Sequence, residues 1–211
     1  METLRRQAPL PETADELCTV ARLLGAPEAS VHLGAGATER RIKELSVGGA
    51  LRSARFVHFA THGLLATEAR QVSQGLAEPA LLLTPPTQAT EEDDGLLTAS
   101  EVAQLKLDAD WVILSACNTA AGNDFEAEPL SGLARAFFYA GSRALLASHW
   151  YVDSEAAVAL VTAAFAEINA RPSVGRAEAL RRAMLALLGR GGRSAHPATW
   201  APFVVVGEGA G

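Results

Sequence analysis

The stretch Trp111-Val-Ile-Leu-Ser-Ala-Cys-Asn118 constrains the fold of this chain more than any other feature. It consists of an apolar run, partly β-branched, that leads through two small residues into a cysteine. Such a short apolar run predicts a buried strand of a parallel sheet. Because open α/β sheets bind ligands at the carboxyl ends of their strands, the run places Cys117 at a candidate functional position. The alternative interpretation is that Cys117 is a small buried hydrophobic residue.

A second run of the same kind, Phe56-Val-His-Phe-Ala-Thr-His62-Gly63, ends in a histidine. Cysteine and histidine at neighbouring strand ends can act as nucleophile and general base. Gly63 has no Cβ, so its backbone N–H can approach a substrate carbonyl closely, although a tight turn would also explain this glycine. We interpret His58, inside the run, as a packing or surface residue rather than a base.

The remaining pattern predicts an α/β fold with a mainly parallel sheet flanked by helices. Further strands are expected at about residues 30–33, 81–83, 143–147 and 203–206, and helices at about 13–24, 38–47, 99–105, 130–140, 153–169 and 173–188. Thr38 and Thr98 are expected to begin the second and third of these helices as N-caps. Right-handed crossovers would bring the strand ends at His62, Cys117 and Ser148 to one edge of the sheet. The acidic run 91–94 is expected to be a solvated loop tip.

Composition excludes several function classes. The formal net charge is -6 and the sequence contains no run rich in Lys and Arg, which argues against a nucleic-acid-binding face. No apolar segment approaches a membrane span and the first residues lack the apolar region of a signal peptide, so we expect a cytoplasmic protein without membrane association. Cys18 and Cys117 have no CxxC neighbours and the histidines are scattered, so we expect no metal. Phosphate-binding glycine motifs are missing, and we expect no cofactor.

Five ordered blocks of the sequence carry a family resemblance. The blocks are Phe59-Ala-Thr-His62-Gly63, Leu114-Ser-Ala-Cys117-Asn-Thr119, Gly132-Leu-Ala-Arg-Ala-Phe137 with Ala140-Gly141, Ser148-His-Trp150-Tyr-Val152-Asp153 and Trp200-Ala-Pro-Phe203-Val-Val. In this order they resemble the CHAT domain family, a group of caspase-like cysteine peptidases related to separases and metacaspases. The resemblance implies a caspase-like domain over residues 11–208, preceded by a polar N-terminal arm at residues 1–10.

The resemblance also implies the chemistry of the site. His62 and Cys117 would form the catalytic dyad, in which the imidazole makes thiolate available. The backbone N–H groups of Gly63 and Cys117 would form the oxyanion hole.

Four further residues are candidate substrate-binding positions by the same resemblance. Ser115 stands where metacaspases carry an aspartate, so a preference for Lys or Arg is not supported. His149 stands where the family usually carries leucine, and local hydrogen bonding is its alternative role. Trp150 and Asp153 match family landmarks, and Asp153 is alternatively the N-cap of the following helix.

The sequence departs from the family at its start. Residues 1–9 do not predict the family's first strand, which is interior in caspase-like sheets, so we expect the sheet to lack this strand and to expose unpaired edges. The expected partners are a protein substrate or a regulatory protein, reached through tetratricopeptide-type repeats outside this chain. Two functions remain open: a caspase-like cysteine endopeptidase, or a non-catalytic interaction module with a silent dyad or a fragment that needs an upstream strand.

Overall fold

A four-stranded sheet forms the centre of the computed structural model, which describes residues 2–72, 78–90, 92–115, 131–149 and 152–210. Its strands lie in the order β1 (Phe56–Phe59), β5 (Trp111–Leu114), β6 (Ala144–Ser148) and β7 (Phe203–Gly207). The first three are parallel, and β7 runs antiparallel to β6. The expected mainly parallel α/β sheet is therefore confirmed.

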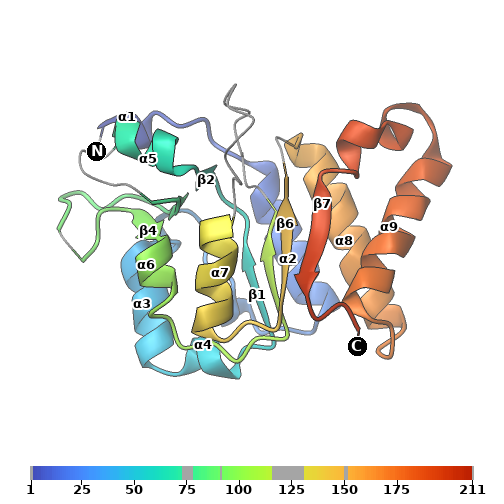
Figure 1. Cartoon of the computed structure of the whole chain (residues 1–211), viewed down its shortest axis with the longest axis horizontal. Helices are drawn as coiled ribbons and strands as arrows, with labels where there is room; N and C mark the ends of the chain where they lie inside the picture. The colour runs from blue at the N-terminus through green and yellow to red at the C-terminus, as the bar shows by residue number, and fades with distance from the viewer. Residues whose placement is uncertain (1, 73–77, 91, 116–130, 150–151, 211) are drawn as a thin grey trace.

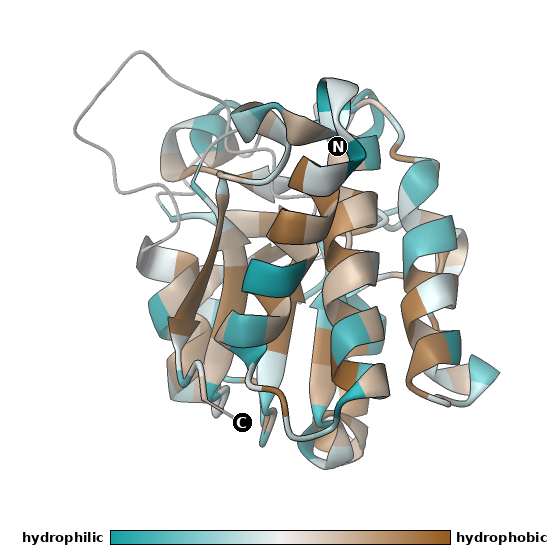
Figure 2. Cartoon of the chain, turned by 90° about the vertical axis from the view of Figure 1, so that its right-hand side faces the viewer, coloured by the Kyte–Doolittle hydropathy of each residue, from teal (hydrophilic) through white to brown (hydrophobic). Residues whose placement is uncertain are grey.

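Helices cover both faces of this sheet (Figure 1). One face carries α3 (Glu39–Val47), α4 (Ala50–Ser53), α6 (Ala99–Val102) and α7 (Ser131–Ala140), and the other carries α2 (Glu12–Leu23), α8 (Ser154–Ala170) and α9 (Arg176–Arg190). Side chains of β5 alternate between the two cores: Val112 packs into the first, and Trp111 and Ile113 pack into the second. Figure 2 shows the resulting hydrophobic strands between the helices. Burial on both faces explains why the strand sequence is continuously apolar.

The N-terminal caps of two helices are formed as the sequence predicts. The side chain of Thr38 accepts a hydrogen bond from the backbone N–H of Arg41 at 3.1 Å. Thr98 and Glu101 form a reciprocal capping box at the start of α6. Gly141 ends α7 with φ +107°, and a Cβ at this position would lie 2.4 Å from the carbonyl oxygen of Leu107. None of the helices in the described ranges is long and apolar enough to cross a bilayer.

A second, three-stranded antiparallel sheet lies beside the first (Figure 1). It contains β2 (Gly63–Leu64), β3 (Ala80–Leu82) and β4 (Leu96–Thr98), and it is accompanied by α5 (Ala66–Val72) and α1 (Glu2–Arg5). Leu4 of α1 is 4% exposed and packs with Leu64 and Leu82 in a small core. The segment that we expected as a polar arm therefore begins with an anchored helix.

The strand expected at residues 30–33 is wrong. The chain forms two short 3-10 helices there, η1 (Glu28–Ser30) and η2 (Gly34–Gly36). Val31 and Leu33 between them have extended backbones, with φ/ψ of -99°/118° and -125°/153°. The local pattern thus gives an extended conformation, but no described strand pairs with it. Short β-like sequences become strands only where a partner backbone completes the ladder.

The acidic run at 91–94 is not simply a solvated tip. Asp93 is 5% exposed, and Arg40 donates a hydrogen bond from Nε to its carboxylate at 3.1 Å. Asp94 accepts a hydrogen bond from the backbone N–H of Leu96 at 2.8 Å. Glu91 lies outside the described residues. The expectation fails because charge runs indicate solvation only when no oppositely charged side chain from elsewhere in the fold reaches them.

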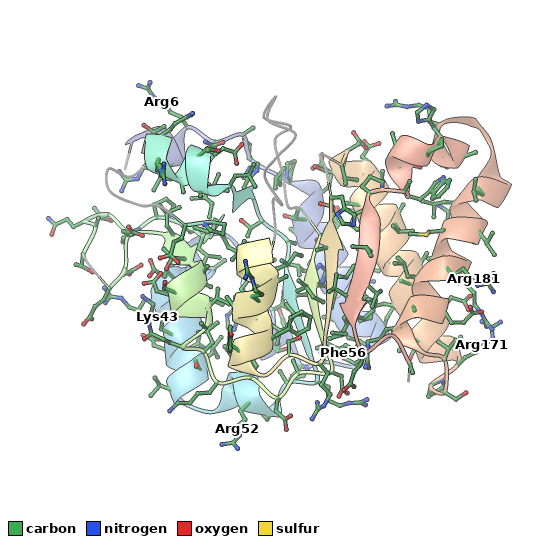
Figure 3. The ribbon with its side chains drawn as sticks, in the orientation of Figure 1. Arg6, Lys43, Arg52, Phe56, Arg171 and Arg181 are labelled. Atoms are coloured by element: carbon green, nitrogen blue, oxygen red, sulfur yellow. The ribbon has the colours of Figure 1, made fainter. Side chains whose placement is uncertain are left out.

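Lys43 connects this loop to α3 and α6. Its Nζ donates to Glu39 at 2.6 Å, to Glu101 at 2.7 Å and to the carbonyl of Glu92 at 2.7 Å, and Figure 3 shows Lys43 among acidic side chains. Burial raises the pKa of Glu39 above its ordinary value, although the hydrogen bond from Lys43 opposes the shift. For Glu101 burial acts in the same direction, but the hydrogen bonds from Lys43 and Thr98 together outweigh it and lower the pKa. Burial would lower the pKa of Lys43, but its hydrogen bonds to Glu101 and Glu39 raise it.

Candidate active site

The candidate site lies at the carboxyl edge of the central sheet. The parallel strands β1, β5 and β6 end there at Phe59, Leu114 and Ser148. The backbone N–H of Ser115 donates to the carbonyl of Phe59 at 3.2 Å and joins the first two ends. The predicted convergence of strand ends is therefore present, whereas Cys117 and Trp150 lie outside the residues that the structure describes.

His62 lies in the loop between β1 and β2, and its ring has a fixed partner. The Nε2 atom lies 2.8 Å from the carbonyl oxygen of Ala8. Because a carbonyl oxygen can only accept a hydrogen bond, Nε2 carries the proton in this contact, and Nδ1 is the basic nitrogen of the neutral ring. The carbonyl of His62 accepts a hydrogen bond from the backbone N–H of Leu82 at 2.9 Å. Ring and backbone are thus both held by neighbouring segments.

Gly63 directs its backbone N–H away from the second sheet. It stands opposite Leu81 in the antiparallel β2–β3 pair, and the neighbouring pair is His62 opposite Leu82. Hydrogen-bonded and non-hydrogen-bonded pairs alternate in such a ladder, and His62 with Leu82 is a hydrogen-bonded pair. Gly63 is therefore in a non-hydrogen-bonded position, and its N–H points to the side of β2 that faces away from β3.

A cleft of about 420 Å³ adjoins His62. Residues 7–10 form one wall, and residues 60–62 with Leu82 and Pro85 form the other. The first wall is held in place by α1, because Leu4 is buried and Arg5 donates a hydrogen bond to the carbonyl of Pro86 at 2.6 Å. The same N-terminal segment therefore orients the His62 ring and borders the cleft.

Behind the site lies a buried polar cluster that sequence reasoning missed. The His58 side chain is 8% exposed, and its Nε2 lies 2.9 Å from Ser115 Oγ and 3.1 Å from Glu16 Oε1. The contact between His58 Nε2 and Glu16 Oε1 is within ion-pair distance but lacks hydrogen-bond geometry. No described group hydrogen-bonds the Glu16 carboxylate or His58 Nδ1. Ser115, a candidate substrate-binding residue, is 1% exposed and directs its hydroxyl to His58. The available signal was Glu16 within the apolar stripe of α2.

Two other candidate residues have local partners. Asp153 is the N-cap of α8, and its carboxylate accepts a hydrogen bond from the backbone N–H of Ala156 at 3.2 Å. His149 is exposed at the end of β6, where its backbone N–H donates to the carbonyl of Pro202 at 2.9 Å. The structure thus gives Asp153 the capping role and leaves His149 at the site edge. Within the described ranges, no group of three or more His, Cys, Asp and Glu side chains could hold a metal ion.

The fold and this edge define the class of the protein: an α/β domain whose mainly parallel sheet carries a histidine beside a cleft at its carboxyl edge. The sequence matches the CHAT domain family over residues 2–208, and the chain belongs to that family. This membership supports a relation to caspase-like peptidases. A comparison with curated proteins found no match.

Proposed function

We propose that this protein is a caspase-like cysteine endopeptidase that cleaves a protein partner, with His62 as the base and Cys117 as the nucleophile. The observation that carries the proposal is the hydrogen bond from His62 Nε2 to the Ala8 carbonyl, beside a cleft of about 420 Å³. It leaves Nδ1 basic and oriented, which is what a cysteine nucleophile needs from its partner. The CHAT family membership supports the assignment of the cysteine.

The reaction begins with proton transfer from the Cys117 thiol to His62 Nδ1. The thiolate attacks the scissile carbonyl carbon, and the N–H groups of Gly63 and Cys117 stabilise the developing oxyanion. The Nδ1–H then donates its proton to the leaving amine as the C–N bond breaks, which leaves a thioester on Cys117. Water hydrolyses the thioester with His62 again acting as base, and the free thiol is restored.

The partner and setting follow from the same proposal. A cytoplasmic location would keep the nucleophilic thiol reduced. The partner is a protein substrate or a regulatory protein, recognised through tetratricopeptide-type repeats outside this chain. Ser115 offers no acidic group two positions before the nucleophile, so we do not propose a basic residue at the cleavage site.

The proposal is tested by cleavage of denatured casein and of a proteome-derived peptide library, analysed by mass spectrometry. We expect cleavage by the native chain, loss of cleavage in Cys117→Ala and at least a 100-fold loss in His62→Gln. Cys18→Ala is the matched control and should cleave normally, because Cys18 lies in α2 and does not line the cleft beside His62. Cleavage that persists in Cys117→Ala would refute the dyad. Complete inactivity of the native chain would instead favour the non-catalytic interaction module.

A further inference from the structure

The polar cluster behind the site contains Glu16 of α2, His58 of β1 and Ser115, which directly follows β5. All three side chains are buried, on the face of the sheet that α2 and α8 cover (Figure 1). Within the described residues, the Glu16 carboxylate and His58 Nδ1 have no hydrogen-bond partner. Buried polar atoms without partners lower stability, and apolar side chains of similar volume often replace a buried ion pair without loss. Stability therefore does not account for this cluster.

The ring of His58 is held in one orientation. Phe165 of α8 stacks on it, with ring centroids 6.4 Å apart and an angle of 26° between the planes. Nε2 lies 3.1 Å from Glu16 Oε1 and 2.9 Å from Ser115 Oγ, so it faces two oxygen atoms. Because a carboxylate oxygen this close would repel the lone pair of an unprotonated nitrogen, Nε2 carries the proton and donates it to Ser115. His58 therefore fixes the direction of the Ser115 hydroxyl.

Ser115 is fastened to β1 by its backbone and by its side chain. Its N–H donates to the carbonyl of Phe59 at 3.2 Å, and its Oγ is the partner of His58. Ser115 stands two positions before Cys117 in the sequence. The start of the segment that leads to the proposed nucleophile is thus held against the strand that leads to the proposed base.

Each member of the cluster belongs to a segment that also supplies the candidate site. His58 stands four positions before His62, and Ser115 leads to the cysteine. Glu16 lies in α2, which follows the cleft wall that contains Ala8, the acceptor for the His62 ring. The cluster therefore connects the three segments on which the geometry of the dyad depends.

We propose that Glu16, His58 and Ser115 are positioning residues for the proposed peptidase reaction. Glu16 and Phe165 orient His58, and His58 orients Ser115, so that the segments keep the geometry in which His62 takes the proton from the thiol. A misplacement of about 1 Å can lower a rate about 100-fold. No member of the cluster lines the cleft beside His62, so the cluster acts on the rate and not on substrate binding. This inference rests on the proposed function, and it replaces substrate contact as the role of Ser115.

The first test measures kcat and KM of the full chain on the library peptide that the native chain cleaves best. Glu16→Met and Ser115→Ala should each lower kcat at least tenfold and change KM less than threefold. Glu16→Gln keeps an oxygen beside His58 and should restore kcat to within threefold of the native value. Thr162→Val in α8 is the matched control, because the Thr162 hydroxyl oxygen is also buried without a described partner, and it should change neither constant.

Stability measurements separate positioning from a structural role. The triple variant Glu16→Met, His58→Phe, Ser115→Ala replaces the cluster with apolar side chains. Its melting temperature should be no lower than that of the native chain, whereas its kcat should fall at least 100-fold. A melting temperature that falls together with kcat in every variant would overturn the proposal in favour of a structural role.

The alkylation rate of Cys117 by iodoacetamide, in a Cys18→Ala background at pH 7, tests the proposal without turnover. Glu16→Met and Ser115→Ala should slow it at least fivefold, because a displaced thiol loses the base that makes thiolate available. Alkylation within twofold of the native rate in both variants would overturn the positioning role. A native chain that cleaves no peptide would instead refute the proposed function, so the two failures are distinguishable.

Discussion

Replacing Lys43 with methionine should destabilise the protein by about 2–3 kcal/mol. Removal of one partner from a fully buried ion pair costs about 3–5 kcal/mol, whereas an exposed pair contributes about 0–1 kcal/mol. The Glu39 side chain is 1% exposed but that of Lys43 is 30% exposed, so some water reaches the remaining charges and the cost falls between these limits. Methionine keeps the apolar stem but donates no hydrogen bond to Glu39 or Glu101.

Urea unfolding at pH 7 measures this loss. Lys106→Met is the matched control, because Lys106 is exposed and its side chain should be replaceable within about 0.5 kcal/mol. Adding Glu39→Gln to Lys43→Met should restore at least about 1 kcal/mol, since a neutral amide no longer leaves a buried charge uncompensated. Losses below about 1 kcal/mol, or equal losses at Lys43 and Lys106, would refute the reasoning.

The pKa shifts of Glu39 and Lys43 also predict how the folding stability of Lys43→Met changes with pH. Because the folded-state pKa of Glu39 is raised, the folded state binds more protons in the window above its ordinary pKa of 4.5, and stability falls as pH rises through that window. Loss of Lys43 widens the window, so the deficit of Lys43→Met should be smaller at pH 4.5 than at pH 7. The raised pKa of Lys43 contributes stability below its ordinary 10.5, which is lost as pH rises through the folded value.

Three other predictions concern single positions. Gly141→Ala should cost at least about 2 kcal/mol in urea unfolding, because Gly141 has a positive φ and its added Cβ would lie 2.4 Å from a carbonyl oxygen. Gly189→Ala is the control in α9: its Cβ meets open space, so it should stabilise the protein by about 0.5–1 kcal/mol, and equal effects of the two variants would contradict this. Asp153→Ala should lower the free energy of unfolding by about 1 kcal/mol through loss of the α8 cap, and it should leave the cleavage rate at saturating substrate unchanged. A loss of turnover without a loss of stability would instead favour a substrate contact. Hydrogen bonds from Arg181 and then Arg182 lower the pKa of Glu178 to about 2, so an NMR titration should find Glu178 still ionised at about pH 3, and Arg181→Ala should raise that pKa.

The sequence was informative where local pattern decides structure. The runs at 56–59, 111–114 and 203–206 are strands, and the continuously apolar run 111–114 is the one buried throughout between the two helical layers. The caps at Thr38 and Thr98 were readable because a hydroxyl placed just before a helix satisfies its first free N–H groups.

The sequence failed where distant partners decide. Residues 31–33 have the extended backbone that their pattern predicts, but a strand also needs a neighbouring backbone, which the pattern cannot supply. Asp93 and Glu16 lie buried where Arg40 and His58 reach them from other elements. His58 packs against Phe165, as expected of a packing residue, but it also has polar neighbours that the local pattern could not show. The role of Ala8 as the hydrogen-bond acceptor for His62 joins residues 54 positions apart in the sequence and carries no local signature.

The central claim is that His62 activates Cys117. Its most direct test is the rate of alkylation of Cys117 by iodoacetamide as a function of pH, measured by mass spectrometry in a Cys18→Ala background. We expect the native pair to give a thiolate that titrates well below the ordinary value of about 8.5, and His62→Gln to return the titration toward that value. A Cys117 thiol that titrates near 8.5 in both proteins would contradict the account.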